Sequence, residues 1–173
     1  MKKLSLYFMM MLGLVQSALA DKTESLGDVL QVMIPSIAYG STFYMDDKEG
    51  EHQFYKSFAM NAVITYGVKY AVNRKRPNGG DYSFPSGHSS SAFQGASFIH
   101  HRYGIAYAIP AYMGATFVAY SRVHAKKHYK SDVVAGAILG SLSSFYLTTE
   151  YKNIKVEPTS MVGGYGVKLS YKW

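Results

Sequence analysis

The stretch "PSGHSSSAFQGASFIHHRYG", from Pro85 to Gly104, joins a proline-started polar turn to the signals of a helix. Serines gather after the turn and a glycine closes the stretch, which predicts a helix that begins at Gly87 or His88. The first backbone N–H groups of a helix have no partner within it, and the positive end of the helix dipole lies behind them. The stretch therefore predicts a helix whose N-terminus can bind an anion.

The rest of the chain up to residue 151 also carries helical signals, namely apolar residues at helical spacing and long uncharged runs. We predict an all-α fold, a compact bundle of about five to six helices. Beside the helix from Gly87, the expected segments are a kinked or broken helix over 27–45 around Pro35, a helix over 54–77, an apolar stretch over 105–120 broken at Pro110, and a helix that starts near Ser131–Asp132 with Ser131 as N-cap.

The first twenty residues, "MKKLSLYFMMMLGLVQSALA", begin with two lysines, continue with an apolar run and end in an A-x-A pattern. This order is typical of a secretory signal peptide, and the alternative is a retained N-terminal anchor. We therefore predict a signal peptide over 1–20 and a helical domain over 21–151 with its core motifs in 54–147. The protein is expected in the periplasm or on the periplasmic face of the cell-envelope membrane.

The C-terminal segment changes its period. In "YGVKLSYKW", from Tyr165 to Trp173, apolar residues alternate with glycine, lysine and serine, which is the two-residue repeat of a strand. We predict a short β-like tail over 152–173, formed as a hairpin with the segment 153–156 and packed on the helices.

The composition narrows the possible partners. The formal charge of +7 falls to +5 without the two lysines of the leader, and a basic exported chain suits phosphate groups, anionic lipid surfaces or nucleic acid. The chain has no cysteine, so disulfides do not stabilise it and the fold depends on packing. Its 16 tyrosines and 9 phenylalanines suit a helical core or a lipid interface.

Basic and small residues surround the predicted anion site. Lys69 and Arg76 are seven residues apart, about two helical turns, so both side chains are expected on one helix face. Arg76 offers a planar fork to two phosphate oxygens, and Lys69 adds a point charge. Gly87 allows close approach of the backbone, and the Ser86 hydroxyl is a further donor. Together these groups predict a phosphate-binding site.

Two histidines give this site a chemistry. His128 and Asp132 are four residues apart, so on a helix the carboxylate can accept the proton of one imidazole nitrogen and leave the other free to attack. His128 is then a nucleophile, and His88 at the rim of the anion site is the general acid. Arg122 supplies a third cation for the charge that develops on the phosphate oxygens.

Three motifs occur in a fixed order: "KYAVNRKRP" over 69–77, "PSGH" over 85–88 and "SRVHAKKHYKSD" over 121–132. With them the chain resembles the type 2 phosphatidic acid phosphatase family, which shares its site with class A bacterial acid phosphatases and vanadium haloperoxidases. The resemblance covers roughly 54–147, outside both the tail and the segment before residue 54.

The resemblance implies a phosphatase that hydrolyses phosphomonoesters through a phosphohistidine, with no metal ion or other cofactor, and the leader-like sequence implies that it is exported. It assigns the site residues as follows: Lys69, Arg76, Ser86, Gly87 and Arg122 bind the phosphate, His88 is the acid, His128 the nucleophile and Asp132 its orienting partner.

The rest of the chain bears on the choice of substrate. Long uncharged helices in a basic, aromatic-rich protein favour a lipid phosphate or polyprenyl diphosphate as substrate, bound at a membrane surface. Nucleic acid is not expected as a partner, and protein partners are unknown. Both a membrane-inserted and a surface-associated enzyme fit this pattern. The alternatives are a soluble periplasmic acid phosphatase for small phosphomonoesters, a vanadium haloperoxidase, whose chains are much longer, and a non-enzymatic envelope-binding protein.

A zinc site is the other alternative from the residues themselves. His124 and His128 are four apart, as two ligands on a helix would be. Ala125 stands where a metalloprotease motif has glutamate, and no acidic third ligand follows nearby. The sequence therefore favours a site without a metal.

Overall fold

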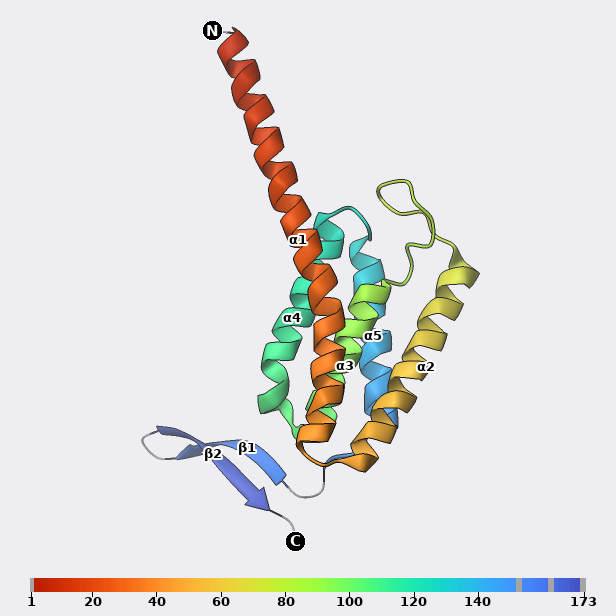
Figure 1. The fold of residues 1–173 in the computed structure, drawn as a ribbon, viewed down its shortest axis with the longest axis vertical. Coiled ribbons are helices and arrows are strands. Elements are labelled where there is room, and N and C mark those ends of the chain that lie inside the picture. The colour runs from red at the N-terminus through yellow and green to blue at the C-terminus, as the bar shows by residue number, and fades with distance from the viewer. Residues whose placement is uncertain (1, 152–153, 162–163, 172–173) are drawn as a thin grey trace.

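The computed structural model describes residues 2–151, 154–161 and 164–171 of the chain (Figure 1). Within these residues it has five helices and one β-hairpin, which confirms the predicted helical bundle with a β-like tail. The elements are α1 (Lys2–Tyr44), α2 (Lys48–Val72), α3 (Gly87–Tyr103), α4 (Ile105–His124), α5 (Lys130–Leu147), β1 (Ile154–Met161) and β2 (Gly164–Tyr171).

Helix α3 is the central element of the bundle. It contacts each of the other four helices, and its buried side chains are mainly serine, alanine and glycine. Small side chains let neighbouring helices approach closely, and larger apolar residues fill the space between them. Phe98 of α3 packs with Phe54 and Ala38 in one core cluster, and Ala92 and Ala96 of α3 pack in a second.

The sequence predicts a kinked or broken helix around Pro35, and the break is wrong, because α1 continues through the proline. Proline has no N–H for the carbonyl of residue 31. That carbonyl, of Gln31, instead accepts a hydrogen bond from the Ser91 hydroxyl of α3 at 3.3 Å. A Cβ at Gly95 would lie 2.8 Å from Pro35 Cα, so this glycine lets α3 approach the proline closely. Helix α4 likewise continues through Pro110.

The start of α1 coincides with the leader-like sequence. Residues 2–20 are helical, and in Figure 1 this part of α1 projects beyond the bundle. The apolar part of a signal peptide is compatible with a helix, so its removal stays a prediction. Among the residues whose side chains the structure describes, no helix is long and apolar enough to cross a membrane.

Helix α2 ends earlier than predicted. Its last residue is Val72, because Asn73 adopts a left-handed conformation (φ 41°, ψ 48°) and its N–H caps the Lys69 carbonyl at 3.1 Å. Asparagine tolerates this conformation better than most residues. Arg76 therefore lies in the loop between α2 and α3 and not on the face of α2, and its helical placement beside Lys69 was wrong.

Helix α5 packs backbone to backbone on the first turns of α3. A Cβ at Gly136 would lie 2.4 Å from the Ser86 carbonyl oxygen, and one at Gly140 would lie 2.1 Å from the Ser90 carbonyl oxygen. No side chain fits between these backbones, so the two glycines set the distance between α5 and the turn that precedes α3.

Gly140→Ala is therefore expected to destabilise the fold by about 1–3 kcal/mol through overpacking, measured as a lower Tm. Gly67→Ala is the matched control, because a Cβ at Gly67 meets nothing within 4 Å and alanine is the better residue in a helix. A Tm for Gly140→Ala at or above that of the Gly67 variant would contradict the close packing.

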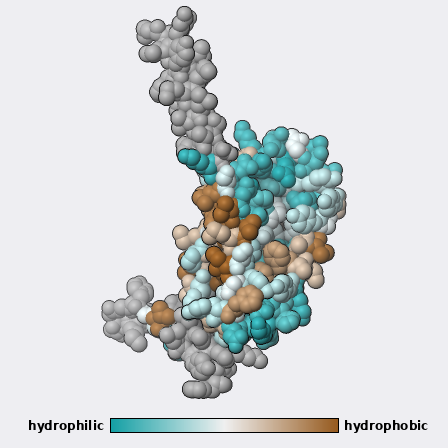
Figure 2. Space-filling model, in the orientation of Figure 1, coloured by the Kyte–Doolittle hydropathy of each residue, from teal (hydrophilic) through white to brown (hydrophobic). Residues whose placement is uncertain are grey.

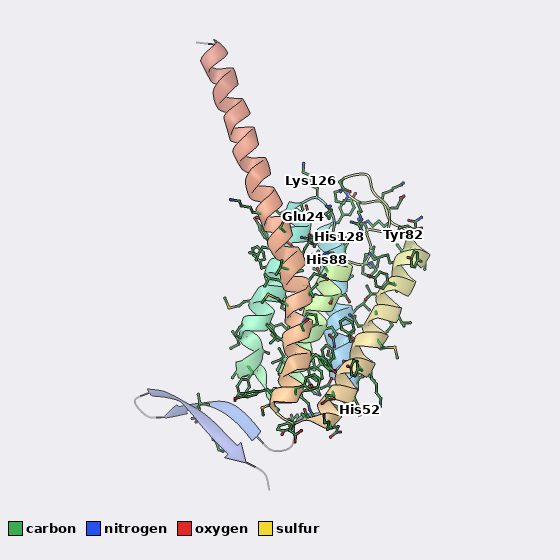
Figure 3. The ribbon with its side chains drawn as sticks, viewed as in Figure 1. Glu24, His52, Tyr82, His88, Lys126 and His128 are labelled. Atoms are coloured by element: carbon green, nitrogen blue, oxygen red, sulfur yellow. The ribbon has the colours of Figure 1, made fainter. Side chains whose placement is uncertain are left out.

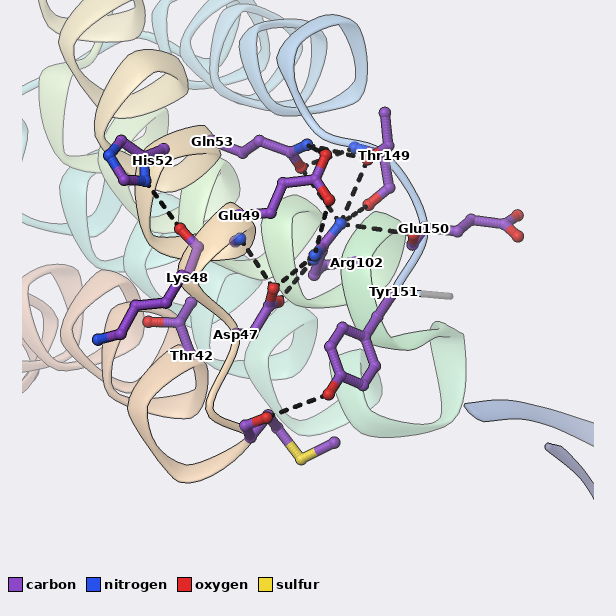
Figure 4. A network of polar contacts seen from close by, with 12 residues as sticks. Thr42, Asp47, Lys48, Glu49, His52, Gln53, Arg102, Thr149, Glu150 and Tyr151 are labelled. Atoms are coloured by element: carbon purple, nitrogen blue, oxygen red, sulfur yellow. Dashed lines mark hydrogen bonds and ion pairs between the residues drawn. The ribbon is translucent and has the colours of Figure 1, made fainter. Parts of the chain in front are cut away.

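A buried ionic network closes the end of the bundle away from residue 87 (Figure 4). The guanidinium of Arg102, near the end of α3, donates two hydrogen bonds to Asp47 at 2.5 and 2.6 Å. The Tyr103 hydroxyl adds a third to the same carboxylate at 3.0 Å, and Arg102 also donates to the Thr149 carbonyl at 2.8 Å. The network ties the α1–α2 turn and the segment after α5 to α3.

Strands β1 and β2 pair antiparallel, with Ile154 opposite Tyr171 and Met161 opposite Gly164. This confirms the predicted hairpin, and β1 contacts both α3 and α4. Asn153 and Trp173, which were included in the prediction, lie outside the described residues.

Candidate active site

A cavity of about 620 Å³ between α1, α2 and α3 brings five of the predicted site residues together. Its walls include Lys69, Arg76, Gly87, His88 and His128. Figure 3 shows His88 and His128 close together at the end of the bundle from which the N-terminal part of α1 projects. The residues come from two helices and two loops, so the fold and not local sequence assembles the site.

Lys69 lies on the last turn of α2 and is almost fully buried. Its ammonium group donates hydrogen bonds to the carbonyl oxygens of Tyr82 at 2.9 Å and Pro85 at 2.8 Å. Burial and the neighbouring charge of Arg76 lower the pKa of Lys69 to about 8. Lys69 therefore holds the loop that leads into α3 and also brings positive charge to the cavity.

Arg76 reaches the cavity from a loop that folds back on itself. Its backbone N–H donates to the Gly80 carbonyl at 2.7 Å, and its Nε donates to the Asp81 carbonyl at 2.9 Å. Its side chain lines the cavity, and its role as a phosphate ligand stays a prediction. The loop, and not a shared helix face, brings Arg76 to Lys69.

The N-terminus of α3 is formed as predicted. Ser86 is the N-cap, and its hydroxyl accepts from the Ser89 N–H at 3.4 Å. Ser86 is fully buried, and its own N–H donates to the Asp132 carbonyl at 2.9 Å, so it builds the turn and does not line the cavity. Gly87 does line the cavity, where the first turn of α3 offers its positive dipole end.

His128 lies just before α5 and not on it, so the expected shared helix face with Asp132 was wrong. Helix α5 begins at Lys130, with Tyr129 and not Ser131 as its N-cap. The His128 Nδ1 atom lies 3.7 Å from Asp132 Oδ2 and 3.5 Å from the Ser83 hydroxyl. Nδ1 thus points to the carboxylate at ion-pair distance, which leaves Nε2 as the nitrogen that can attack.

Asp132 has three closer partners than His128. Its carboxylate accepts from the Ser83 hydroxyl at 2.5 Å, the Tyr129 N–H at 2.9 Å and the Arg74 guanidinium at 2.9 Å. Arg74 also lies over the Tyr129 ring, 4.1 Å from its centroid. The carboxylate is fully buried and held from three sides, so it is a fixed negative charge beside the histidine.

Burial and the charges of Arg76 and Lys69 lower the pKa of His128 to about 4. The imidazole is therefore neutral over most of the pH range in which enzymes work. A neutral imidazole has a lone pair on the nitrogen that carries no proton, which is what a nucleophile requires.

Arg122 does not line the cavity. It is buried behind His88, where its guanidinium donates to Asp28 Oδ1 at 2.7 Å and to the Glu24 carbonyl at 2.6 Å, both on α1. The same Asp28 oxygen lies 2.9 Å from His88 Nε2. The structure thus places Arg122 near His88 through their shared partner Asp28, in contact with α1 and not with the cavity.

The PAP2 superfamily matches residues 3–155, which is most of the chain. The chain belongs to the PAP2 superfamily.

Relatives of this PAP2 chain agree with that assignment. It is 38% identical over 87 residues to a lipid A 1-phosphatase of Porphyromonas gingivalis, an alignment that covers 48% of this chain and 19% of the relative. The chain thus spans about a fifth of the length of this curated relative. The crystal structure of Aquifex aeolicus LpxE has a TM-score of 0.55 at 21% identity, over 69% of this chain and 83% of the other, and shows a shared fold.

A second solved structure, a transmembrane PAP2-type phosphatidylglycerolphosphate phosphatase from Bacillus subtilis, is also 21% identical to this PAP2 chain. Its TM-score is 0.47, over 84% of this chain and 92% of the other.

Sequence reasoning missed three residues of the PAP2 site. Arg74 and Ser83 both bind Asp132, and Asp28 binds His88 and Arg122. Arg74 belongs to the basic motif over 69–77, but this motif does not show which arginine faces which partner. Ser83 and Asp28 carry no local signal, because their partners lie 49 or more residues away.

The two histidines considered as zinc ligands have different surroundings. His124 is exposed and stacks on Tyr120 with a centroid distance of 5.4 Å, whereas His128 is buried. Among the residues that the structure describes, no group of three or more histidine, aspartate or glutamate side chains is placed to hold a metal ion.

Proposed function

We propose that this chain is a phosphatase that hydrolyses the phosphate ester of a lipid at the periplasmic face of the cell-envelope membrane, through a phosphohistidine on His128 and without a metal ion. One observation carries the proposal: the cavity that contains the cationic and histidine groups extends as a groove between α1 and α2, where its walls include Val32, Pro35, Tyr39, Phe54 and Phe58. The lipid A 1-phosphatase to which the chain is similar supports a lipid substrate.

In the proposed reaction Lys69, Arg76 and the first turn of α3 hold the phosphate group. His128 Nε2 attacks phosphorus, the bond to the ester oxygen breaks, and His88 gives its proton to the leaving oxygen. Water then attacks the phosphohistidine while His88 takes a proton from it, which releases phosphate and restores both histidines. Asp132, with its negative charge near Nδ1, stabilises the cationic ring of the intermediate.

The groove runs down α2 from the phosphate site. Lys69 and Phe54 mark its two ends on this helix, and at about 1.5 Å per residue they are about 22 Å apart. The end of the groove at Lys69 carries the cationic and histidine groups, and the far end on α2 is lined by Phe58 and Phe54. This order of polar and then apolar lining suits a phosphorylated head group followed by a hydrocarbon chain, and a small soluble ester would leave the far half empty.

The outer surface supports a location at a membrane. Large apolar side chains are exposed on α1, α2, α4 and α5, and Figure 2 shows them gathered along α1. An exposed apolar surface of this extent marks a binding site for a protein partner or for a membrane. Lipid is the occupant that suits a groove open to such a surface. Exposed lysines at the site end, Lys75, Lys126 and Lys130, suit anionic lipid head groups. Export rests on the leader-like sequence of residues 1–20.

Ala62→Phe tests the groove. Ala62 lines it, so a phenyl ring there should obstruct a hydrocarbon chain and lower kcat/KM for a long-chain phosphatidate in mixed micelles by about tenfold or more. Hydrolysis of p-nitrophenyl phosphate, which needs only the phosphate end, should change little.

The adjacent Val63 is 70% exposed and outside the groove, so Val63→Phe is the matched control and should leave both rates unchanged. Equal rates on the lipid for both variants would contradict a groove-bound chain and favour a soluble periplasmic acid phosphatase. Absence of phosphate release from either ester by the wild type would contradict the proposed function as a whole.

A further inference from the structure

One carboxylate oxygen on α1 joins two of the predicted site residues. Asp28 Oδ1 accepts from Arg122 Nη1 at 2.7 Å and lies 2.9 Å from His88 Nε2. Hydrogen bonds to a charged carboxylate are stronger than those between neutral groups. Asp28 therefore fixes the acid histidine against a buried arginine, and α1, which lies outside the three motifs, becomes part of the site.

Each of the three guanidinium nitrogens of Arg122 donates a hydrogen bond in this arrangement. Its side chain is only 3% exposed, and it donates to Ser121 Oγ at 3.1 Å and to the Glu24 carbonyl at 2.6 Å as well as to Asp28. Figure 3 shows Glu24 and His88 on neighbouring segments at this end of the bundle. The buried guanidinium thus orients Asp28 toward His88, while the Asp28 side chain is itself 49% exposed.

The bond to Asp28 decides how His88 can act. The Nε2–H group donates a hydrogen bond to the carboxylate and keeps its proton. The proton that the ring can transfer to a substrate is therefore the one on Nδ1. After that transfer the neutral ring keeps its Nε2 proton and its bond to Asp28. His88 lines the cavity, so its ring is in place for a leaving oxygen.

Charges from three elements act on His88. Burial and the charge of Arg122 on α4 lower the pKa of His88, Asp28 on α1 raises it, and Arg76 in the loop lowers it further. The net effect is a pKa below the ordinary value. Asp28 is the one negative charge among these groups, and it opposes the loss of the proton that the acid must give.

We propose that Asp28 is a positioning residue for the reaction, which holds His88 with Nδ1 toward the leaving oxygen and keeps the ring protonated against the two arginines. This inference rests on the proposed function. In the step concerned, the phosphorus–oxygen bond breaks, the Nδ1 proton moves to the leaving oxygen, and the water of the second step returns a proton to Nδ1.

Asp28→Asn in the full chain tests this role, because it keeps the shape and removes the charge. With Asp28 neutral, the pKa of His88 falls, so kcat/KM should begin to decline at a lower pH than in the wild type. Turnover of an alkyl phosphate, whose leaving group needs the proton, should fall by about tenfold or more, and that of p-nitrophenyl phosphate much less. Asp28→Glu should restore part of the loss.

Asp46→Asn makes the same chemical change in the exposed turn after α1, at the other end of the bundle, and should leave the pH profile unchanged. Equal losses of Asp28→Asn on both esters with an unshifted profile would overturn the proposal and leave Asp28 a structural residue. A rise in activity would also overturn it, because Asp28 would then compete with phosphate for Arg122.

An NMR titration of the histidine rings separates this inference from the proposed function. Asp28→Asn should move the titration midpoint of His88 to lower pH, and it should do so without any substrate present. If the wild type hydrolyses neither ester, the proposed function fails, and the titration still decides whether Asp28 acts on His88. An unchanged midpoint would overturn the role of Asp28.

Discussion

His128→Ala is expected to lower the turnover of both lipid and soluble phosphate esters by about a thousandfold or more. The reason is chemical, because the variant lacks the atom that attacks phosphorus. Among the described residues, His88 is the one other histidine that lines the cavity. The rate is measured as phosphate released from p-nitrophenyl phosphate and from a long-chain phosphatidate.

His124→Ala is the matched control for this variant. His124 is exposed on the last turn of α4, four residues earlier, and stacks on Tyr120 outside the cavity. Its removal should leave both rates within about twofold of the wild type. A His128→Ala variant that keeps its fold and more than a tenth of the wild-type rate would contradict a nucleophilic role.

Lys69→Met is expected to lower kcat/KM for both esters by about a hundredfold or more. The variant loses a positive charge at the phosphate site and also the two hydrogen bonds to the Tyr82 and Pro85 carbonyls, which hold the loop before α3. Methionine fills a similar volume, so the comparison removes the charge and the donors without opening a large gap.

Lys56→Met makes the same change on an exposed position of α2 and should leave kcat/KM unchanged. Circular dichroism and Tm show whether the Lys69 variant still folds. A folded Lys69→Met protein with wild-type kcat/KM would contradict the assignment of Lys69 to the phosphate site.

The parts of the fold that sequence predicted depend on local chemistry. The start of α3 at Gly87 and its end before Gly104 follow from serine and glycine preferences that act within one turn of the chain. The hairpin follows from the alternation that any strand with one apolar face shows. These signals need no knowledge of what packs against the segment.

The error at Pro35 concerns a position that a distant residue decides. Helix α1 tolerates Pro35 because Ser91, 56 residues away, satisfies the carbonyl that the proline leaves unpaired. The end of α2 has a local signal, because asparagine favours the left-handed conformation of Asn73, and the prediction of a helix up to Pro77 did not use it. Helix α5 starts after His128 and not at it. His128 and Asp132 therefore do not share a helix face, and Nδ1 lies 3.7 Å from the carboxylate.

The candidate site was predicted more fully than the helix ends. Five residues predicted from the motifs line one cavity. The motifs identify which residues carry the chemistry, and the packing of the helices brings those residues together. Arg122 was expected at the phosphate but contacts Asp28, because a buried guanidinium takes the nearest carboxylate. That carboxylate lies 94 residues away, beyond what periodicity or spacing can show.

Rapid-quench labelling tests phosphoryl transfer to His128 most directly. The wild-type chain is mixed with a lipid phosphate labelled in its phosphate group, quenched without acid because phosphohistidine is acid-labile, digested and mapped by mass spectrometry. We predict label on the peptide that contains His128, formed in EDTA as well as in buffer, and lost in His128→Ala. Label on another residue, or steady phosphate release with no labelled His128 at any quench time, would contradict the proposed mechanism.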